Sequence, residues 1–179
     1  KGCDAVRTNL ELLARTRAEN PDAVIIYKPH PDVQARLRKG GIDEAQALEF
    51  ADLLLTDVDP VALIMAVDSV WTMTSLLGFE ALIRDTAVTC LGMPFYAGWG
   101  LTRDLGIAPI RRTARPTLDG LVHAALIGYA RYNDPLSGLP CPVEVIVERL
   151  QNADIPLPGP VNRIAAMVQG LWAAKPFRR

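Results

Sequence analysis

The segment Ser69–Cys90, SVWTMTSLLGFEALIRDTAVTC, decides the fold. Ser69–Met73 and Ala87–Cys90 are short runs rich in β-branched residues, which predicts two strands. Between them, Leu76–Ile83 is an apolar stretch of helical character, and the pair Thr74-Ser75 consists of residues that favour a helix start. Strands that alternate with helices across short loops pair in parallel and carry helices on their faces. The segment therefore predicts an α/β protein, with a Rossmann-like parallel sheet and helices on both faces.

The same alternation extends toward the N-terminus. Thr8-Asn9-Leu10-Glu11 has the form of a capping box, and Asn20-Pro21-Asp22 ends the helix that follows it. Downstream of this helix the sequence predicts, in order, a buried strand at Ala23–Tyr27, a helical stretch after His30-Pro31-Asp32 that Gly40-Gly41 breaks, a helix at Asp43–Phe50, a strand at Leu53–Thr56 and a short helix from Asp59-Pro60 through Ala66.

After Cys90 the pattern changes. Gly92–Gly100 is a loop rich in glycine and aromatic residues. Apolar residues at helical spacing then predict three helices, around Leu118–Leu126, Val143–Leu150 and Val161–Trp172. We expect a Rossmann-like lobe over residues 1–131 and a helical C-terminal extension over residues 132–179 that packs on it.

Composition excludes several classes of function. The formal net charge of −1 gives no electrostatic reason to expect a nucleic-acid partner. Three widely spaced cysteines and two histidines favour neither a disulfide framework nor a metal site, and they fit a reducing compartment. The longest apolar run, Val61–Val67, is far shorter than the ~20 residues that span a bilayer. The chain opens at Lys1 without an initiator methionine, and we interpret it as an excerpt or a processed product.

Three segments that follow predicted strands could carry chemistry, because ligands of open parallel sheets bind beyond the carboxyl ends of the strands. The first is Lys28-Pro29-His30-Pro31-Asp32, in which the prolines restrict the backbone around an ammonium and an imidazole that can both donate to phosphate oxygens. The alternative is a satisfied loop histidine beside a solvated lysine, and the spacing does not separate the two.

The second segment is Met73-Thr74-Ser75-Leu76, at a junction from strand to helix. Thr74 and Ser75 are favoured helix caps, and this is the simpler interpretation. A helix start that faces the crevice would also offer two hydroxyls and free N–H groups to a phosphate. Glu80 lies on the same helix within an apolar stretch, where it either accepts hydrogen bonds from ribose hydroxyls or faces solvent.

The third segment is the loop Gly92–Gly100, continuing to Thr102. Glycine allows a ligand to approach the backbone closely, and Phe95, Tyr96 and Trp99 could form the wall of a base or sugar site. The alternative is an aromatic plug over the edge of the sheet, which the residues alone favour.

These residues also resemble a known family. The stretches YKPHPDV, VWTMTSLLGFEALIRD and LGMPFYAGWGLTRD are similar to those of capsule polysaccharide biosynthesis proteins, and most of all to β-Kdo transferases of the KpsC type. RRTARPTLDGLVHAALI and YNDPLSGLPC continue the likeness, which covers about Arg7 to Leu150. The order of His-Pro and a hydroxyl pair also resembles bacterial sialyltransferases, which use another CMP-activated sugar.

The resemblance implies a fold and an activity. KpsC-type proteins carry two related modules, each similar to the GT-B fold with two Rossmann-like lobes, and they move Kdo with retention from CMP-β-Kdo to a phosphatidylglycerol-type lipid-linked acceptor. The implied C-terminal lobe holds the nucleotide, without a metal or other cofactor. A chain of this kind would be cytoplasmic and peripheral at the inner membrane of a Gram-negative bacterium.

Carried onto this sequence, the resemblance assigns Lys28 and His30 to the CMP phosphate or the Kdo carboxylate, and Thr74 and Ser75 to the phosphate. Glu80 would hold the ribose. The loop that contains Gly92, Tyr96 and Trp99 would border the donor sugar or cytidine.

The resemblance also implies parts that precede this chain: a first strand with an acidic stretch and a whole acceptor lobe. The acidic residue that acts as nucleophile or base in Kdo transfer would lie there. We therefore expect the chain to bind donor without turning it over, and we assign no catalytic residue. Two alternatives remain: a transferase that uses another CMP-sugar such as CMP-sialic acid, and a non-catalytic module that docks on capsule assembly or export proteins. Which of the two transferase modules the chain represents also stays open, and the proline-rich segment and last helix favour the C-terminal copy.

Overall fold

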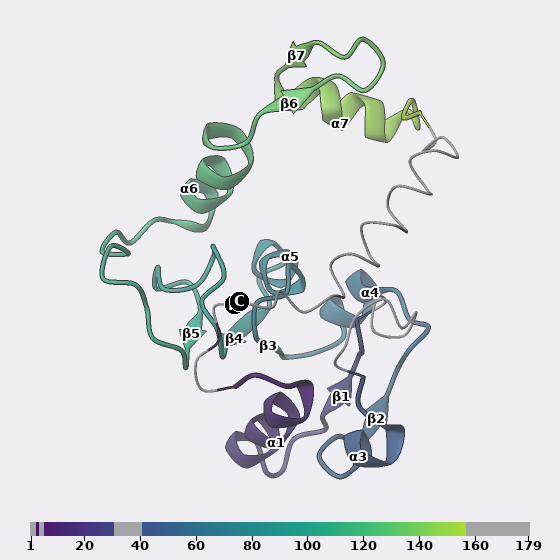
Figure 1. Ribbon diagram of the computed structural model, residues 1–179, viewed down its shortest axis with the longest axis vertical. Helices are drawn as coiled ribbons and strands as arrows, with labels where there is room; N and C mark the ends of the chain where they lie inside the picture. The colour runs from purple at the N-terminus through teal and green to yellow at the C-terminus, as the bar shows by residue number, and fades with distance from the viewer. Residues whose placement is uncertain (1–2, 4–5, 31–40, 157–179) are drawn as a thin grey trace, which may run out of the picture. The chain divides into compact units, whose positions relative to one another are not determined.

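The computed structural model describes residues 3, 6–30 and 41–156. The chain divides into two compact units, Lys1–Leu118 and Asp119–Arg179, whereas the sequence placed the division between residues 131 and 132. Figure 1 shows the order of the elements along the chain. The predicted helix after His30-Pro31-Asp32 and the predicted last helix at Val161–Trp172 lie outside the described residues.

The strands of the first unit pair in parallel. β1 (Ile26–Tyr27) pairs with β2 (Leu53–Leu54). β3 (Ser69–Thr72) pairs with β4 (Ala87–Cys90) over all four residues, with Ser69 opposite Ala87 and Thr72 opposite Cys90. β5 (Arg103–Asp104) extends this second set on the far side of β4. The predicted parallel pairing is confirmed.

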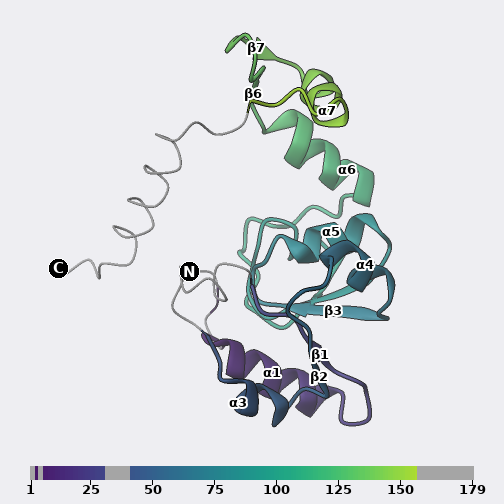
Figure 2. The ribbon, with the colours of Figure 1, turned by 90° about the vertical axis from the view of Figure 1, so that its right-hand side faces the viewer.

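Helices cover both faces of these strands. They are α1 (Asn9–Glu19), α3 (Glu44–Leu48), α4 (Pro60–Met65) and α5 (Leu77–Ile83). Figures 1 and 2 both show α1 and α3 on one side of the strands and α4 and α5 on the other. The α/β class with helices on both faces, as the alternation of segments predicts, is therefore the observed fold.

The first helix begins at the capping box that the sequence predicts. The Thr8 hydroxyl accepts a hydrogen bond from the Glu11 amide at 3.1 Å, and the Glu11 carboxylate accepts one from the Thr8 amide at 3.1 Å. These bonds satisfy amide groups that the first turn of a helix otherwise leaves unpaired.

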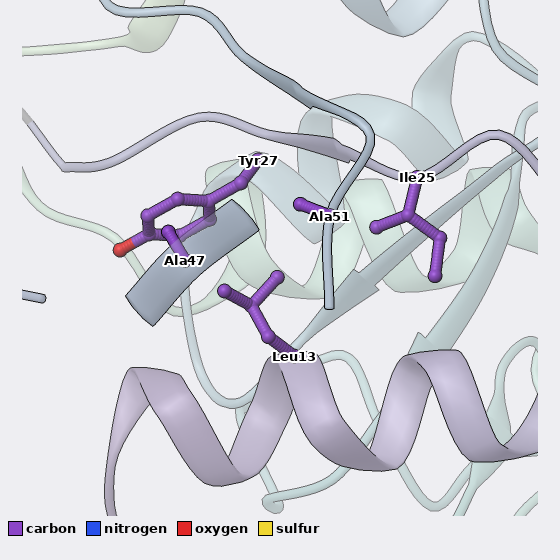
Figure 3. Packing of buried hydrophobic residues seen from close by; sticks show 5 residues of the cluster. All are labelled: Leu13, Ile25, Tyr27, Ala47 and Ala51. Atoms are coloured by element: carbon purple, nitrogen blue, oxygen red, sulfur yellow. The ribbon is translucent and has the colours of Figure 1, made fainter. Parts of the chain in front are cut away.

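A compact apolar cluster lies between α1, α3 and β1. Figure 3 shows Leu13 pointing from α1 toward the other four members of this cluster, which are Ile25, Tyr27, Ala47 and Ala51. Ala47 is completely buried, and its small side chain allows α3 to approach the other elements closely. Ile42, Phe50 and Leu54 pack against the cluster.

Arg17 connects α1 to the segments before β1 and β2, beside this cluster. Its guanidinium donates to the carbonyl oxygens of Phe50 and Ala23 at 3.0 and 2.8 Å, and Nη2 lies 2.6 Å from an Asp52 carboxylate oxygen. The same carboxylate oxygen accepts the Ile25 amide at 2.7 Å. This amide bond and, after it, the Arg17 bond lower the pKa of Asp52.

The second unit contains α6 (Leu118–Val122), which continues as the π-helical segment η1 (His123–Gly128), and then α7 (Val143–Gln151). Between η1 and α7, β6 (Tyr132–Asn133) and β7 (Pro140–Cys141) form an antiparallel hairpin. The two helices are where the apolar spacing predicts them. Within the described ranges, no helix has the length and apolar character that crossing a membrane requires.

Asp134 ties the hairpin to α7. Its carboxylate accepts the Ser137 hydroxyl at 2.8 Å, the Leu136 amide at 3.2 Å and the Arg149 Nε at 3.1 Å. The side chain of Asp134 is about 10% exposed, and the Arg149 and Ser137 bonds lower the pKa of its carboxyl to about 2.

Replacing Arg17 by Ala should destabilise the first unit. The change removes charged hydrogen bonds to Phe50, Ala23 and Asp52, which are worth about 1.5–3 kcal/mol each at most and less in combination. We expect a melting temperature lower by several degrees. Arg15→Ala is the control on the same helix, since it removes only an exposed pair with Glu19, which is worth at most about 1 kcal/mol. Equal melting temperatures for the two variants would contradict this role of Arg17.

The second unit should lose stability in acid. Because the folded-state pKa of Asp134 lies below the ordinary value, its contribution is present above about pH 4 and is lost as the pH falls from there toward 2. Amide hydrogen exchange of α7 should accelerate across this interval. An Asp134→Asn variant should exchange faster at neutral pH and lack the acid step, whereas Glu144→Gln should behave like the parent chain. An acid step that persists in Asp134→Asn would assign it to another group.

Candidate functional site

The structure brings two of the three predicted segments together at the carboxyl ends of β3 and β4. Because these strands end opposite each other at Thr72 and Cys90, the segments that follow them start side by side. The Leu91 amide donates to the Thr72 carbonyl at 2.9 Å, and the Gly92 amide donates to the Met73 carbonyl at 3.1 Å. The hydroxyl pair Thr74-Ser75 and the loop Gly92–Gly100 therefore lie side by side beyond these strand ends, and Gly92 itself is buried.

The backbone around Ser75 is fixed by local hydrogen bonds. The Ser75 amide donates to the Thr72 hydroxyl at 3.2 Å, and the Leu77 amide donates to the Ser75 hydroxyl at 3.3 Å. The Ser75 hydroxyl therefore pairs with the first amide of α5, whereas the N-cap position is Leu76, which makes no side-chain cap bond. A hydroxyl that accepts such a bond keeps its own proton for donation to an anion. Thr74 is exposed beside it.

Tyr96 packs against the turn that contains Ser75 and is buried. Its side chain is completely buried, and its hydroxyl donates to the Ser75 carbonyl at 2.5 Å. Burial raises the pKa of the phenol, and the electrostatic interaction with the neighbouring Cys90 raises it further. Tyr96 therefore contacts the backbone of Ser75, a predicted donor ligand. That its loop borders the donor stays a prediction.

Gly78 provides the space for Tyr96. A Cβ atom at position 78 would lie 2.3 Å from the Tyr96 hydroxyl oxygen and 2.8 Å from the ring carbon that carries it, which no side chain can adopt without a shift. Glycine is therefore needed at position 78 so that Tyr96 can pack there. This packing offsets the usual free-energy cost of glycine in a helix.

The remaining aromatic residues of the loop support each other. Phe95 packs edge-on against Phe79 and Tyr96, with ring centroids 4.9 and 5.3 Å apart, and 43% of Phe95 remains exposed. The Trp99 indole N–H donates to the Phe95 carbonyl at 2.7 Å. This arrangement agrees with the aromatic plug that the residues alone favoured, and the exposed ring of Phe95 remains available to a ligand.

The other predicted ligands lie on the same unit. Lys28 follows β1, and its ammonium lies 3.4 Å from the carbonyl oxygen of Thr56, which follows β2. His30 is exposed. Glu80 is half-buried on α5, where its carbonyl accepts Arg84 at 2.8 Å. That His30 and the Thr74-Ser75 pair face one anion stays a prediction.

Two residues of this region were not singled out from the sequence. Thr72 lies in a strand pattern, where its hydroxyl is indistinguishable from that of any other strand threonine, yet it accepts the Ser75 amide. Asp104 accepts the Gly98 amide at 2.9 Å and the Thr102 hydroxyl at 2.6 Å. Gly98 has a φ of +81°, a backbone conformation that glycine adopts at little cost, and this could have marked the turn.

A parallel α/β unit with polar groups beyond its strand ends is the architecture of proteins that bind nucleotides and similar anions. Residues 1–132 match the protein family described as "Capsule polysaccharide biosynthesis protein". The chain belongs to this capsule polysaccharide biosynthesis family, as its motifs indicate.

Curated and solved relatives agree with this assignment. The lipopolysaccharide-processing protein LpsZ of Rhizobium meliloti is 49% identical over 131 residues, which are 73% of this chain and 30% of LpsZ. Among solved structures, the β-Kdo 2,7 transferase of Thermosulfurimonas dismutans KpsC matches with a TM-score of 0.76 and 39% identity, over 86% of this chain and 48% of that one.

The β-Kdo 2,4 transferase of the same KpsC matches with a TM-score of 0.65 and 35% identity, over 78% of this chain and 43% of that one. The chain thus spans less than half of either solved structure and less than a third of LpsZ.

A Gly78→Ala variant should displace Tyr96. Since the new Cβ would overlap the phenol, we expect the hydrogen bond from Tyr96 to the Ser75 carbonyl to break. The free energy of unfolding should fall by about 1–3 kcal/mol, as is typical of overpacking, and the melting temperature should fall with it. Gly128→Ala is the matched control, because its Cβ would meet its nearest neighbour at an ordinary 3.7 Å. A Gly78→Ala protein as stable as the control would show that Tyr96 has room to move.

Proposed function

We propose that this chain is the donor-nucleotide lobe of a capsule polysaccharide glycosyltransferase that moves Kdo from CMP-β-Kdo to a lipid-linked acceptor. The observation that carries the proposal is the likeness to the KpsC β-Kdo 2,7 transferase, which extends over 86% of this chain at 39% identity. The hydroxyl pair and the aromatic loop lie side by side within the matched region, at the strand ends where α/β folds bind their ligands.

The proposed site binds the donor through its charged and polar groups. Thr74 and Ser75 donate hydroxyl protons to the CMP phosphate. Lys28 and His30 donate hydrogen bonds to that phosphate or to the Kdo carboxylate, and the Lys28 ammonium adds positive charge. Fixed donors of this kind stabilise the charge that develops on the departing phosphate, and this chemistry needs no metal ion. Charge-assisted hydrogen bonds to phosphate are the strong contributors to such binding.

The sugar and base occupy the surface around this phosphate. Glu80 lies one turn into α5 from the hydroxyl pair and accepts hydrogen bonds from the ribose hydroxyls. Gly92 permits close approach of the backbone, and Trp99 borders the sugar or cytidine. We assign no nucleophile or general base to this chain, so the proposal is donor binding, and transfer requires an acceptor lobe.

Titration calorimetry with CMP tests the proposal. We expect the 179-residue chain to bind CMP, and to bind UMP and UDP more weakly. A chain that is folded by circular dichroism and binds none of the three would refute the assignment, and a preference for UDP would point to a transferase of another donor class.

Single substitutions should identify the groups that bind. His30→Ala and Ser75→Ala should each weaken CMP binding by about 10–150-fold, the effect of removing a hydrogen bond to a charged group. His123→Ala replaces an exposed histidine of the second unit, and Ser69→Ala replaces an exposed serine at the opposite end of β3, so both controls should bind normally. If His30→Ala or Ser75→Ala unfolds the chain, the role of that residue is structural.

A further inference from the structure

Arg112 binds the aromatic loop Gly92–Gly100 through its guanidinium. Its Nη1 donates to two loop carbonyls, those of Pro94 at 2.7 Å and Ala97 at 2.6 Å. Its guanidinium carbon lies 5.5 Å from the centre of the Trp99 ring, within reach of a cation–π interaction. A Cβ at Gly98 would lie 3.1 Å from Arg112 Cδ, so the arginine stem lies directly over the loop backbone.

A second anchor holds the same turn. Asp104, in β5, accepts the Gly98 amide at 2.9 Å, while Arg112 binds the carbonyl of the preceding residue, Ala97. The turn between Ala97 and Gly98 is therefore fixed by a carboxylate on its N–H side and a guanidinium on its C=O side. Charged partners make stronger hydrogen bonds than neutral ones, so this turn is well defined.

The fixed loop in turn positions Tyr96, which directly precedes that turn. The phenol is buried between Gly78, Phe79 and Phe95, and its hydroxyl donates to the Ser75 carbonyl. A donor at the Ser75 carbonyl orients the peptide unit between Ser75 and Leu76, which directly follows the hydroxyl pair Thr74-Ser75. Arg112 and the hydroxyl pair are thus connected through a continuous series of contacts.

We propose that Arg112 and Tyr96 are positioning residues that act in series on the phosphate-binding hydroxyls of Thr74 and Ser75. The inference rests on the proposed function, since it assigns a purpose to this series of contacts. Neither residue touches the donor. Arg112 fixes the aromatic loop, the loop fixes Tyr96, and Tyr96 fixes the peptide at Ser75 in the orientation that a phosphate requires. Binding sites gain affinity when supporting residues hold the contacting groups in place before the ligand arrives.

The test measures CMP and cytidine binding to Tyr96→Phe, Arg112→Ala and the double variant, by calorimetry or ligand-observed NMR. Each single variant should bind CMP about fivefold more weakly, the effect of one hydrogen bond, and should bind cytidine, which lacks the phosphate, within twofold of the parent. Because the residues act in series, the double variant should bind CMP no more weakly than the weaker single variant.

Two controls match the chemistry of these changes. Tyr132→Phe removes a tyrosine hydroxyl that also donates to a backbone carbonyl, that of Leu126 at 2.7 Å, and Arg111→Ala removes one exposed positive charge beside Arg112. Both should bind CMP as the parent chain does. If Arg112→Ala fails to fold, Arg112→Lys, which keeps the charge but not the guanidinium geometry, takes its place with the same expected direction.

Amide hydrogen exchange without nucleotide separates this inference from the proposed function. The Ser75 and Leu77 amides should exchange faster in both single variants than in the two controls. Three results would refute the proposed series of contacts even when the parent binds CMP. They are unchanged exchange of these amides, equal losses of CMP and cytidine affinity, and single effects that add in the double variant. A parent chain that binds no CMP would overturn the proposed function and, with it, the purpose assigned to Arg112 and Tyr96.

Discussion

The structure of the candidate site depends on the parallel register of β3 and β4. Because Thr72 lies opposite Cys90, the two strands end together, and the chain leaves both at the same edge. One exit becomes the hydroxyl-bearing turn into α5, and the other becomes the aromatic loop. A shift of register by one residue would reverse the faces of the strand side chains and would separate Gly92 from Met73, to which it is hydrogen-bonded. Strand pairing, which involves only backbone atoms, thus determines which side chains share a site.

Much of this fold follows from sequence pattern, because the pattern is strong where burial is strong. The strand at Ala87–Cys90 and the helix at Leu77–Ile83 agree with their predicted positions to within a residue, since continuous apolar runs permit few alternatives. The hairpin of β6 and β7 was not predicted, because two-residue strands carry no periodicity. Contacts within the chain divide the two compact units at Leu118, the first residue of α6, and a change of pattern along a sequence does not carry that information.

The site was harder to derive than the fold. Sequence reasoning placed two of the segments beyond strand ends, where the structure has them, because loops at such ends are where polar residues and glycine gather. It could not assign depth within them: Tyr96 and Phe95 are adjacent aromatic residues, yet the first is completely buried and the second is 43% exposed. Which of them faces inward depends on the space that Gly78 leaves, and Gly78 lies eighteen positions away in the sequence. Arg112, farther along still, gave no local signal of its contact with the loop.

The second unit differs from the first in what stabilises it. Over the part of this unit that the structure describes, Leu121 is the buried apolar side chain, and α7 leaves Val147 and Leu150 46% and 59% exposed. The Asp134–Arg149 ion pair connects the hairpin to α7 in this described part. Denaturant sensitivity and the heat-capacity change of unfolding both scale with the apolar surface that unfolding newly exposes. The described part of this unit has little such surface to expose, so its local unfolding should depend weakly on urea.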